Sequence, residues 1–405
     1  MEQTINMETH VSSSVRAFPG ALRWVLATGL LLAACSPTAA PLPSSSSGNI
    51  PSVSSPASAA SPVAPSAQAG TGGTAISDCP PSGSSTRLDG AGATFPAPLY
   101  QRWFSDYKAL CNVEVNYQAI GSGGGIQQHT AKTVQFGASD GIMAQAQKDA
   151  ARGTLAIPTV AGPEAIVMNL PGLQNGQVKL TPDTLAGIFL GEISKWNDPR
   201  IRSDNASVNL PDMDVIVVHR SDGSGTTNIF TSYLAAVSPA WKDRVGAGNS
   251  VNWPTGLGGE GNAGVAGQVR QLPGAVGYVE FAYAKQNNLV WAALRNKSGR
   301  FVEPSLAGAT AAMEGVQIPD STEVMIVDSA NADAYPIAGF TWLLVYEDQQ
   351  DAAVARTLVH LMWWAMHKGG AIATQLDYST LSPAALRAGE AQLRKVKAGG
   401  VPILP

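Results

Sequence analysis

The chain has 405 residues, of which 44% are hydrophobic, 14% are charged and 42 are glycine. This length predicts two domains of ordinary size together with further segments. The formal net charge is -4, with no run of basic residues, which argues against nucleic-acid binding because a phosphate backbone requires clustered lysine and arginine. A small anionic ligand is compatible with this composition, since local dipoles and single arginines matter more for it than net charge.

Residues 1–34 have the pattern of a signal peptide. Two arginines precede an apolar run from Trp24 to Ala34, which is too short to span a bilayer but has the length of a signal-peptide h-region. The run ends in Leu32-Ala-Ala-Cys35, which resembles the lipobox of bacterial lipoproteins. That resemblance implies cleavage before Cys35 and lipidation of this cysteine. The alternative is an ordinary signal peptide with a chance cysteine.

Residues 35–85 are rich in Ser, Pro, Ala and Gly and carry almost no charge. They cannot bury enough apolar surface to offset the entropy lost on ordering, so we expect a flexible linker. A linker behind a lipid anchor predicts an exported protein, held on the outer side of the cytoplasmic membrane in the periplasm or at the cell surface. In that oxidising compartment we expect Cys79 and Cys111 to form a disulfide, with two separate thiols as the alternative.

After the linker, amphipathic stretches of helical length alternate with short apolar runs. In chain order, the sequence predicts a helix over 97–110, strands over 113–117, 165–170 and 215–218, a helix over 228–236, a strand over 342–346 and a helix over 352–367. Most of these strands are continuous apolar runs of the kind buried in parallel sheets. The alternation predicts an α/β fold with mostly parallel sheets.

Four turns rich in glycine, serine or threonine adjoin predicted helices. They are Gly92–Pro96, Gly121–Gly125, Gly137–Asp140 and His219–Thr227. A helix N-terminus has unpaired N–H groups and partial positive charge, glycines let the backbone approach a ligand, and hydroxyl groups add donors. Arg220 adds a charged planar fork suited to a tetrahedral oxyanion. Each turn alone is typical of a helix cap, but together the four predict an anion site.

Two other patterns were weighed as chemical sites. The glycine-dense segment Trp253–Asn262 lacks the ending of a P-loop and the context of a dinucleotide loop, so we interpret it as structural. The stretch Gly137–Gly141 fits the G-x-S-x-G pattern of α/β-hydrolases, which would make Ser139 a nucleophile. That chemistry needs a histidine base after the serine, and none of the later histidines stands in a convincing place. We expect no esterase activity, no metal site and no cofactor.

Several motifs resemble those of one family. They are GAGATFPAPLY, YQAIGSGGGIQ, FGASD, HRSDGSGTTNIFTSYLA, WPTGLGGEGN and LPGAVGYVEFAYAKQNNL. In type and order they are similar to the motifs of the phosphate-binding proteins of Pst-type ABC importers, from about Leu88 to Leu381. The resemblance implies a two-lobed periplasmic-binding-protein-like fold (type II) with phosphate in the interlobe cleft. Lobe I would comprise residues 86–160 and 336–405, and lobe II residues 161–335.

The resemblance also implies which residues bind the phosphate: Thr94, Phe95, Ser122, Asp140, Arg220, Asp222, Ser224, Gly225 and Thr226. Hydroxyl and backbone N–H groups would donate to the anion, Asp140 would accept a hydrogen bond from it, and Arg220, held by Asp222, would pair with its oxygens. Two positions depart from the family pattern. Gly123 stands where many relatives have a second serine, and Gly141-Ile142-Met143 stands where Ala-Pro is common. Both departures could alter the loops without removing a matched residue.

A carboxylate in an anion site has a chemical reason if the ligand still carries a proton. Hydrogen phosphate and dihydrogen phosphate both have an O–H to donate, and an ionised Asp140 accepts it. Sulfate has no proton at neutral pH and would leave the carboxylate unpaired, at a cost of about 1–3 kcal/mol or more. A helix N-cap is the alternative role of Asp140.

The expected function is to bind inorganic phosphate outside the cytoplasm and deliver it to a high-affinity ABC importer. Its partners would be phosphate, the permease subunits of the importer, and the membrane through a lipid anchor, and we expect a monomer that binds no nucleic acid. A phosphatase-like hydrolase acting on phosphate esters and a receptor for sulfate or molybdate are the alternatives. The first needs a metal pair or an activated nucleophile, and the second should lack the aspartate acceptor.

Overall fold

The computed structural model describes residues 76–405. The predicted signal peptide, the lipidation site Cys35 and most of the predicted linker lie outside the described residues. Within the described part of the chain, no helix is long and apolar enough to cross a membrane.

Most strands belong to one mixed sheet. Its strands are β1 (Arg87–Gly92), β2 (Glu114–Ala119), β3 (Phe136–Ser139), β4 (Thr154–Met168), β6 (Ile216–Arg220), β7 (Leu257–Gly259), β8 (Ala275–Glu280), β9 (Val290–Trp291) and β12 (Ala338–Tyr346). Two small sheets are formed by β5 (Lys179–Leu180), β10 (Ala293–Arg295) and β11 (Phe301–Val302), and by β13 (Asp348–Gln349), β14 (Lys397–Ala398) and β15 (Val401–Pro402).

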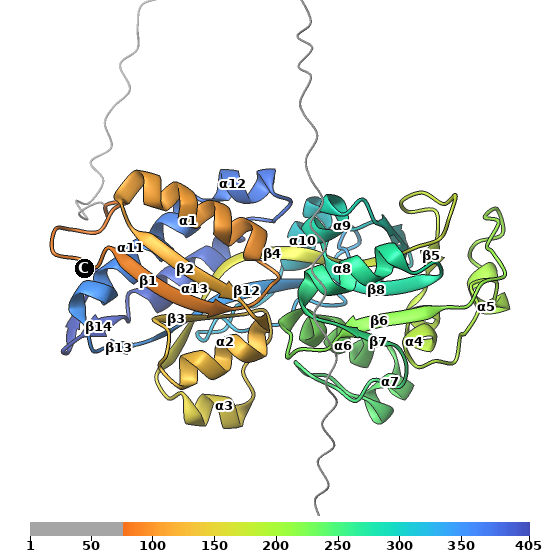
Figure 1. Ribbon diagram of the computed structural model, residues 1–405, viewed down its shortest axis with the longest axis horizontal. Coiled ribbons are helices and arrows are strands. Elements are labelled where there is room, and N and C mark those ends of the chain that lie inside the picture. Colours follow the sequence, from red (N-terminus) through yellow and green to blue (C-terminus); the bar gives the residue numbers. More distant parts are fainter. Residues whose placement is uncertain (1–75) are drawn as a thin grey trace, which may run out of the picture. The chain divides into compact units, whose positions relative to one another are not determined.

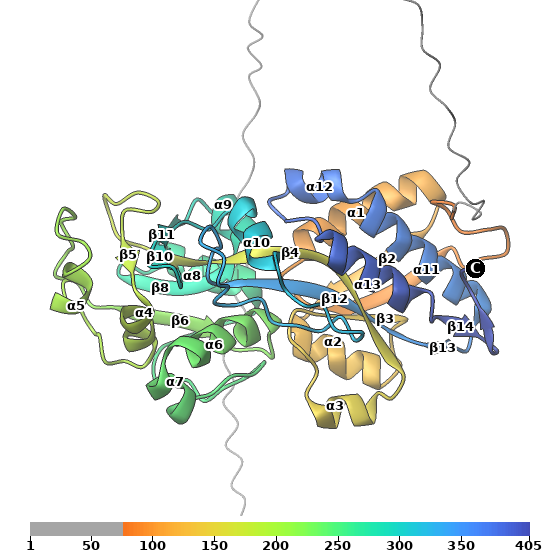
Figure 2. The ribbon, with the colours of Figure 1, turned by 180° about the vertical axis from the view of Figure 1, so that it is seen from behind.

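The main sheet combines two parallel groups with an antiparallel centre. Its order is β2-β1-β3-β12-β4-β8-β6-β7, and β9 also pairs with β4. β1 is parallel to β2 and β3, and β6 is parallel to β7 and β8. β12 is antiparallel to β3 and β4, and β4 is antiparallel to β8. The predicted parallel pairing therefore describes the two outer groups, while β4 and β12 carry the chain between them in opposite directions (Figures 1 and 2).

The long strand β4 changes partner along its length. Residues 154–163 pair with β12, and residues 164–168 pair with β8. The predicted lobe boundary near residue 160 falls inside β4, and the second one, near residue 336, falls just before β12 begins. The two chain crossings thus coincide with these strands, and the limits of the lobes stay a prediction.

Helices flank both groups of strands. They are α1 (Ala97–Cys111), α2 (Gly121–Thr130), α3 (Gln145–Ala150), α4 (Pro182–Phe189), α5 (Pro199–Arg202), α6 (Gly225–Val237), α7 (Pro239–Arg244), α8 (Gly261–Gln271), α9 (Phe281–Gln286), α10 (Leu306–Met313), α11 (Ala352–His367), α12 (Gly370–Gln375) and α13 (Pro383–Leu393). The predicted helices over 97–110 and 352–367 are confirmed as α1 and α11. The helix predicted over 228–236 begins earlier, at Gly225, so that it starts in the serine-rich turn itself.

Helix α1 shows how the sequence positions these elements. Its apolar residues recur every three or four positions, and Leu99, Trp103 and Tyr107 are almost fully buried against the sheet. The helix ends at Asn112, which takes the left-handed conformation that a small polar residue tolerates. Figure 1 shows α1 and α2 on opposite sides of β1. Because β1, β2 and β3 are parallel, the turns that follow their carboxyl ends gather at one edge of the sheet.

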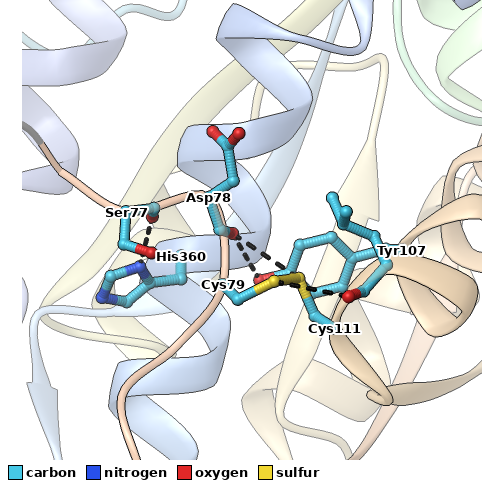
Figure 3. The surroundings of a disulfide bond; sticks show 7 residues. Ser77, Asp78, Cys79, Tyr107, Cys111 and His360 are labelled. Carbon is cyan, nitrogen blue, oxygen red and sulfur yellow. Dashed lines mark hydrogen bonds between the residues drawn. A yellow bond between two sulfur atoms is a disulfide. The ribbon is translucent and has the colours of Figure 1, made fainter.

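The last part of the predicted linker is attached to the folded body. Cys79 and Cys111 are joined by a disulfide, which links this segment to the end of α1 (Figure 3). The Tyr107 hydroxyl donates to the Asp78 carbonyl at 3.1 Å, and His360 Nδ1 lies 2.7 Å from the Ser77 carbonyl oxygen. Apolar content alone predicted a flexible segment here, because it takes no account of a covalent bond and of backbone groups that find partners on α1 and α11.

We expect the double variant Cys79→Ser/Cys111→Ser to lower the free energy of unfolding by about 2–4 kcal/mol. The disulfide spans 32 residues of sequence, and cross-linking a loop of this length reduces the entropy of the unfolded chain. Denaturant unfolding of the oxidised wild type and the double variant measures the difference. Adding a reductant to the wild type should reproduce the variant. Equal stability of the oxidised wild type and the variant would contradict the prediction.

Candidate anion-binding site

Arg220 is the one predicted ligand with a full positive charge, and it stands at the end of β6. Its side chain is 1% exposed, which requires a partner for the guanidinium. Arg220 Nε donates to Asp222 Oδ1 at 2.7 Å, and Nη2 pairs with Asp222 Oδ2. Nη1 donates to Thr226 Oγ1 at 3.3 Å. The guanidinium has five N–H groups, so these three bonds leave two N–H groups for a ligand.

The start of α6 supplies further donors beside Arg220. Ser224 caps this helix, because its hydroxyl accepts from the Thr227 N–H at 3.1 Å. The N–H groups of Gly225 and Thr226 belong to the first turn, which has no intrahelical acceptors. All three residues from Ser224 to Thr226 are buried. They present backbone donors and the positive end of the helix dipole to the same place as Arg220.

Asp140 follows β3 directly and is only 1% exposed. Its Oδ1 accepts from the Thr341 hydroxyl at 2.9 Å, and its Oδ2 lies 3.4 Å from the Ser122 hydroxyl. The Asp140 N–H also donates to Ser122 Oγ at 3.2 Å. The side chain therefore does not cap a helix, and its two oxygens can accept further hydrogen bonds. Ser122 stands in the first turn of α2, whose opening N–H groups also lack helical partners.

The turn between β1 and α1 contributes Thr94 and Phe95. Both backbone carbonyls of this turn are occupied, since Tyr283 donates to the Thr94 oxygen at 2.7 Å and Tyr378 to the Phe95 oxygen at 2.8 Å. The Thr94 hydroxyl accepts from Asn262 Nδ2 at 2.9 Å. These bonds hold the turn in place.

Glycines allow the turns to touch. A Cβ added at Gly225 would lie 2.5 Å from the Gly141 nitrogen and 2.6 Å from the Asp140 Cβ, so the start of α6 lies directly against the Asp140 turn. A Cβ at Gly121 would lie 2.2 Å from Asp222 Oδ2. Gly121 has a φ of 84°, a conformation that favours glycine. The turn that carries Ser122 is therefore in contact with the Arg220–Asp222 pair.

The two departures from the family pattern also lie at these contacts. The Gly123 N–H donates to the Gly223 carbonyl at 2.8 Å, and a Cβ at Gly123 would lie 3.0 Å from the Gly223 Cα. A Cβ at Gly141 would lie 2.1 Å from Asn249 Oδ1. At both positions the glycine faces a neighbouring turn at close range, so a side chain there would require Gly223 or the Asn249 side chain to shift.

The environments of Asp140 and Asp222 shift the pKa values of their carboxyl groups in opposite directions. Burial raises the pKa of Asp140 to about 7, and the hydrogen bond from Thr341, the charge of Arg220 and the bond from Ser122 oppose this rise. Burial also acts to raise the pKa of Asp222, but the hydrogen bonds and charge of Arg220 outweigh it and lower this pKa overall. Asp222 is therefore an ionised partner of Arg220, whereas Asp140 changes its protonation near neutral pH.

We expect this titration to make the folded protein less stable as pH rises. The pKa of Asp140 rises from 3.8 to about 7 on folding, so between these values the folded state holds a proton that the unfolded state has lost. The stabilising contribution is complete below about pH 3.8 and disappears towards pH 7, by up to ~4 kcal/mol.

The measurement is the free energy of unfolding of the wild type minus that of Asp140→Asn, in a buffer without phosphate or sulfate. Asparagine does not titrate, so the other acids cancel in this difference. The difference should fall between about pH 4.5 and about pH 7 and then level off. A difference that stays constant or rises with pH would contradict the raised pKa.

The hydrolase interpretation of Ser139 finds no support in the geometry. The Ser139 hydroxyl donates to the Gly141 carbonyl at 2.6 Å and accepts from the Gly141 N–H at 3.1 Å, as in a turn. His129, which precedes it in the chain, instead has its Nε2 2.8 Å from the Thr154 hydroxyl. Among residues 76–405, no group of three or more His, Cys, Asp or Glu side chains is arranged to hold a metal ion.

The structure brings the predicted residues together and adds two that the sequence analysis did not assign. Thr341 lies on β12 and bonds to Asp140, and Asn262 lies at the start of α8 and bonds to Thr94 and Thr226. Asn262 ends the glycine-dense segment interpreted as structural, and its side chain connects this segment to Thr94 and Thr226. A signal for Thr341 was present, because it is a single polar residue in an otherwise apolar strand and a buried hydroxyl needs a partner.

Comparison with known sequences finds related proteins over most of the chain. The model of the PBP superfamily domain matches residues 64–362. The phosphate-binding protein PstS of Pasteurella multocida is 45% identical over 307 residues, which cover 75% of this chain and 89% of that protein. The protein of the same name from Haemophilus influenzae is 43% identical over 300 residues, covering 74% of this chain and 90% of the relative.

A structural comparison adds the fold. The phosphate-binding protein of Stenotrophomonas maltophilia superposes with a TM-score of 0.61 at 21% identity, covering 76% of this chain and 94% of that one. At this identity the likeness speaks for the fold alone. The predicted two-lobed α/β fold of periplasmic binding proteins is confirmed.

Proposed function

The chain belongs to the PstS family of phosphate-binding proteins, and we propose that it binds inorganic phosphate and delivers it to a phosphate ABC importer. In this proposal Thr94, Phe95, Ser122, Arg220 and the start of α6 donate hydrogen bonds to the anion. Asp140 accepts one from it, and Asp222 holds Arg220 in place.

One observation carries the proposal. Many hydrogen-bond donors and the buried carboxyl group of Asp140 converge at the same place, with the Gly225 backbone directly against Asp140. An anion without a proton matches the donors but not the carboxylate, and a neutral ligand matches neither the donors nor the charge of Arg220. A protonated oxyanion such as hydrogen phosphate satisfies both, since it offers several bare oxygens and one O–H.

Burial of the site supports a mechanism of closure. Thr94, Ser122, Asp140, Arg220 and Thr226 are all at most 9% exposed, so the anion reaches them only when the contacts between the turns open. The chain crosses between the two strand groups through β4 and β12, and bending there would separate Thr94 and Asp140 from Arg220 and α6. We infer that phosphate binds to an open form and is enclosed when the lobes close, and that the closed form then docks on the permease.

The alternatives are less well supported. A phosphatase would need a nucleophile or metal pair next to the phosphorus, and the hydroxyl of Ser139 is engaged by the backbone of Gly141. A sulfate or molybdate receptor would place an unprotonated oxyanion against Asp140. The named relatives are phosphate-binding proteins, which also favours binding without turnover.

The place of action is part of the proposal. A signal peptide over residues 1–34 and lipidation at Cys35 would put the folded body on the outer side of the cytoplasmic membrane. The disulfide between Cys79 and Cys111 is compatible with an oxidising compartment.

The test combines calorimetry with a turnover assay. Titration with inorganic phosphate should give saturable binding, and incubation with phosphate monoesters should release no phosphate above the uncatalysed rate. Steady release of phosphate from a monoester would contradict the proposal. The Ser139→Ala variant is a matched control, because under this proposal it should bind phosphate like the wild type, whereas a hydrolase would lose its activity.

A further inference from the structure

Asn262 occupies a central position that none of the roles above explains. It is the second residue of α8 and is 0% exposed. Its side-chain amide donates to Thr94 Oγ1 at 2.9 Å and to Thr226 Oγ1 at 3.2 Å. Thr94 stands before α1, and Thr226 opens α6. One amide group therefore connects hydroxyls from the two groups of strands that are proposed to close around the anion.

The orientation of this amide is determined by its other neighbour. Asn262 Oδ1 accepts from the Glu280 backbone N–H at 2.9 Å. A donor on that side requires the oxygen of the amide to face Glu280, which leaves the NH₂ group for Thr94 and Thr226. The Asn262 backbone N–H, one of the unpaired groups at the start of α8, also donates to Thr94 Oγ1 at 3.2 Å.

These bonds fix the direction of two hydroxyl protons. A hydroxyl oxygen has two acceptor sites and one donor. Thr94 Oγ1 accepts twice from Asn262, and Thr226 Oγ1 accepts once from Asn262 and once from Arg220. With their acceptor sites used, both hydroxyls can only donate to a further partner. An anion with bare oxygens is such a partner.

We propose that Asn262 is a positioning residue for phosphate binding, which turns the hydroxyls of Thr94 and Thr226 into obligatory donors and joins them across the closed site. This inference rests on the proposed function, because it assigns a second role at the same site. It explains how these two hydroxyls act as donors beside the acceptor Asp140. It also means that the two hydroxyls become fixed only when the turns that carry them meet at α8.

A double-mutant cycle tests this role by phosphate titration. Asn262→Ala should weaken phosphate binding by about 10- to 100-fold, because two hydroxyls lose their fixed direction. In the Thr94→Val/Thr226→Val background there is no hydroxyl left to orient, so adding Asn262→Ala should change the affinity by less than about twofold. A purely structural effect of Asn262 would lower affinity equally in both backgrounds, and that additive result would overturn the proposal.

Two further variants serve as controls for this double-mutant cycle. Asn205 is a matched control, a buried asparagine whose Nδ2 also has two acceptors, the carbonyls of Lys179 and Ile201. Asn205→Ala should lower thermal stability without changing phosphate affinity. The isosteric Asn262→Asp should weaken binding more than Asn262→Ala does, because a carboxylate would draw the two hydroxyl protons away from the anion. A smaller loss than with alanine would overturn the proposal.

The same titrations separate this inference from the proposed function. If the wild-type protein does not bind phosphate, the proposed function is wrong and the role of Asn262 falls with it. If the wild type binds phosphate but the cycle is additive, only the role of Asn262 is wrong.

Discussion

Replacing Arg220 with methionine should weaken phosphate binding by about 10²- to 10⁴-fold. The two N–H groups that Arg220 retains beyond its bonds to Asp222 and Thr226 are available to the anion. Each charge-assisted hydrogen bond contributes about 1.5–3 kcal/mol, so losing two costs about 3–6 kcal/mol of binding free energy. Methionine has a similar length and no charge, which limits the loss of packing.

The Arg220→Met substitution also leaves the Asp222 carboxylate without its positively charged partner. Without Arg220, Asp222 keeps a hydrogen bond from the Gly261 N–H at 3.0 Å but loses its counter-ion. We therefore expect Arg220→Met to be less stable than the wild type, and Arg220→Met/Asp222→Asn to recover stability without recovering phosphate affinity. Thermal unfolding and calorimetric titration of the three proteins measure both quantities. An Arg220→Met protein that binds phosphate within about tenfold of the wild type would contradict the role of Arg220.

Replacing Asp140 with asparagine should remove most of the discrimination against sulfate. The carboxylate accepts from Thr341 and Ser122, and asparagine can keep the first of these bonds through its oxygen. Its NH₂ group then replaces the acceptor that faces the ligand with a donor. A bare sulfate oxygen gains a hydrogen bond, and the O–H of phosphate loses one. With about 1–3 kcal/mol for each change, the phosphate-to-sulfate affinity ratio should fall by about 30-fold or more.

Two control variants test whether the loss of sulfate discrimination is specific to the Asp140 carboxylate. Ser139→Ala alters the neighbouring residue, whose hydroxyl bonds only to the backbone of Gly141, and should leave the ratio unchanged. Thr341→Val removes the bond to Asp140 Oδ1 but keeps the carboxylate, so it should weaken phosphate binding without admitting sulfate. Competition of sulfate against bound phosphate measures the ratio in each protein. An Asp140→Asn variant that still rejects sulfate would show that selectivity arises elsewhere.

Local sequence signals predicted the parts of the site that are built from neighbouring residues. The turns that carry Thr94, Ser122, Asp140 and Arg220 were recognised because glycine and hydroxyl residues precede helices, and the family resemblance supplied their order. Contacts between residues far apart in the sequence leave no such local sequence signal. Asn262 lies 168 residues from Thr94, and Thr341 lies 201 residues from Asp140, so only the folded chain reveals these partners.

The predicted position of the central strand β4 differs from the structure for a related reason. The sequence predicted a strand over 165–170, whereas β4 extends from Thr154 to Met168. Pro158, Gly162 and Pro163 are residues that weaken a strand pattern, so the predicted strand begins at residue 165 instead of at Thr154. In the structure β4 continues through these residues, and its register with β12 shifts once, between Thr341 and Trp342, where Thr159 is an extra residue next to Pro158. The antiparallel pairing of β12 with β3, in which Trp342 stands opposite Ser139, places Thr341 beside Asp140.

The central claim is that the site recognises an oxyanion through its proton, and the titration of the wild-type protein with phosphate and with sulfate tests it most directly. At alkaline pH, where Asp140 is ionised, both anions are tetrahedral and doubly charged, but only hydrogen phosphate has a proton for Asp140. We predict saturable binding of phosphate and no displacement of phosphate by a large excess of sulfate. Equal binding of the two anions, or binding of neither, would contradict the account.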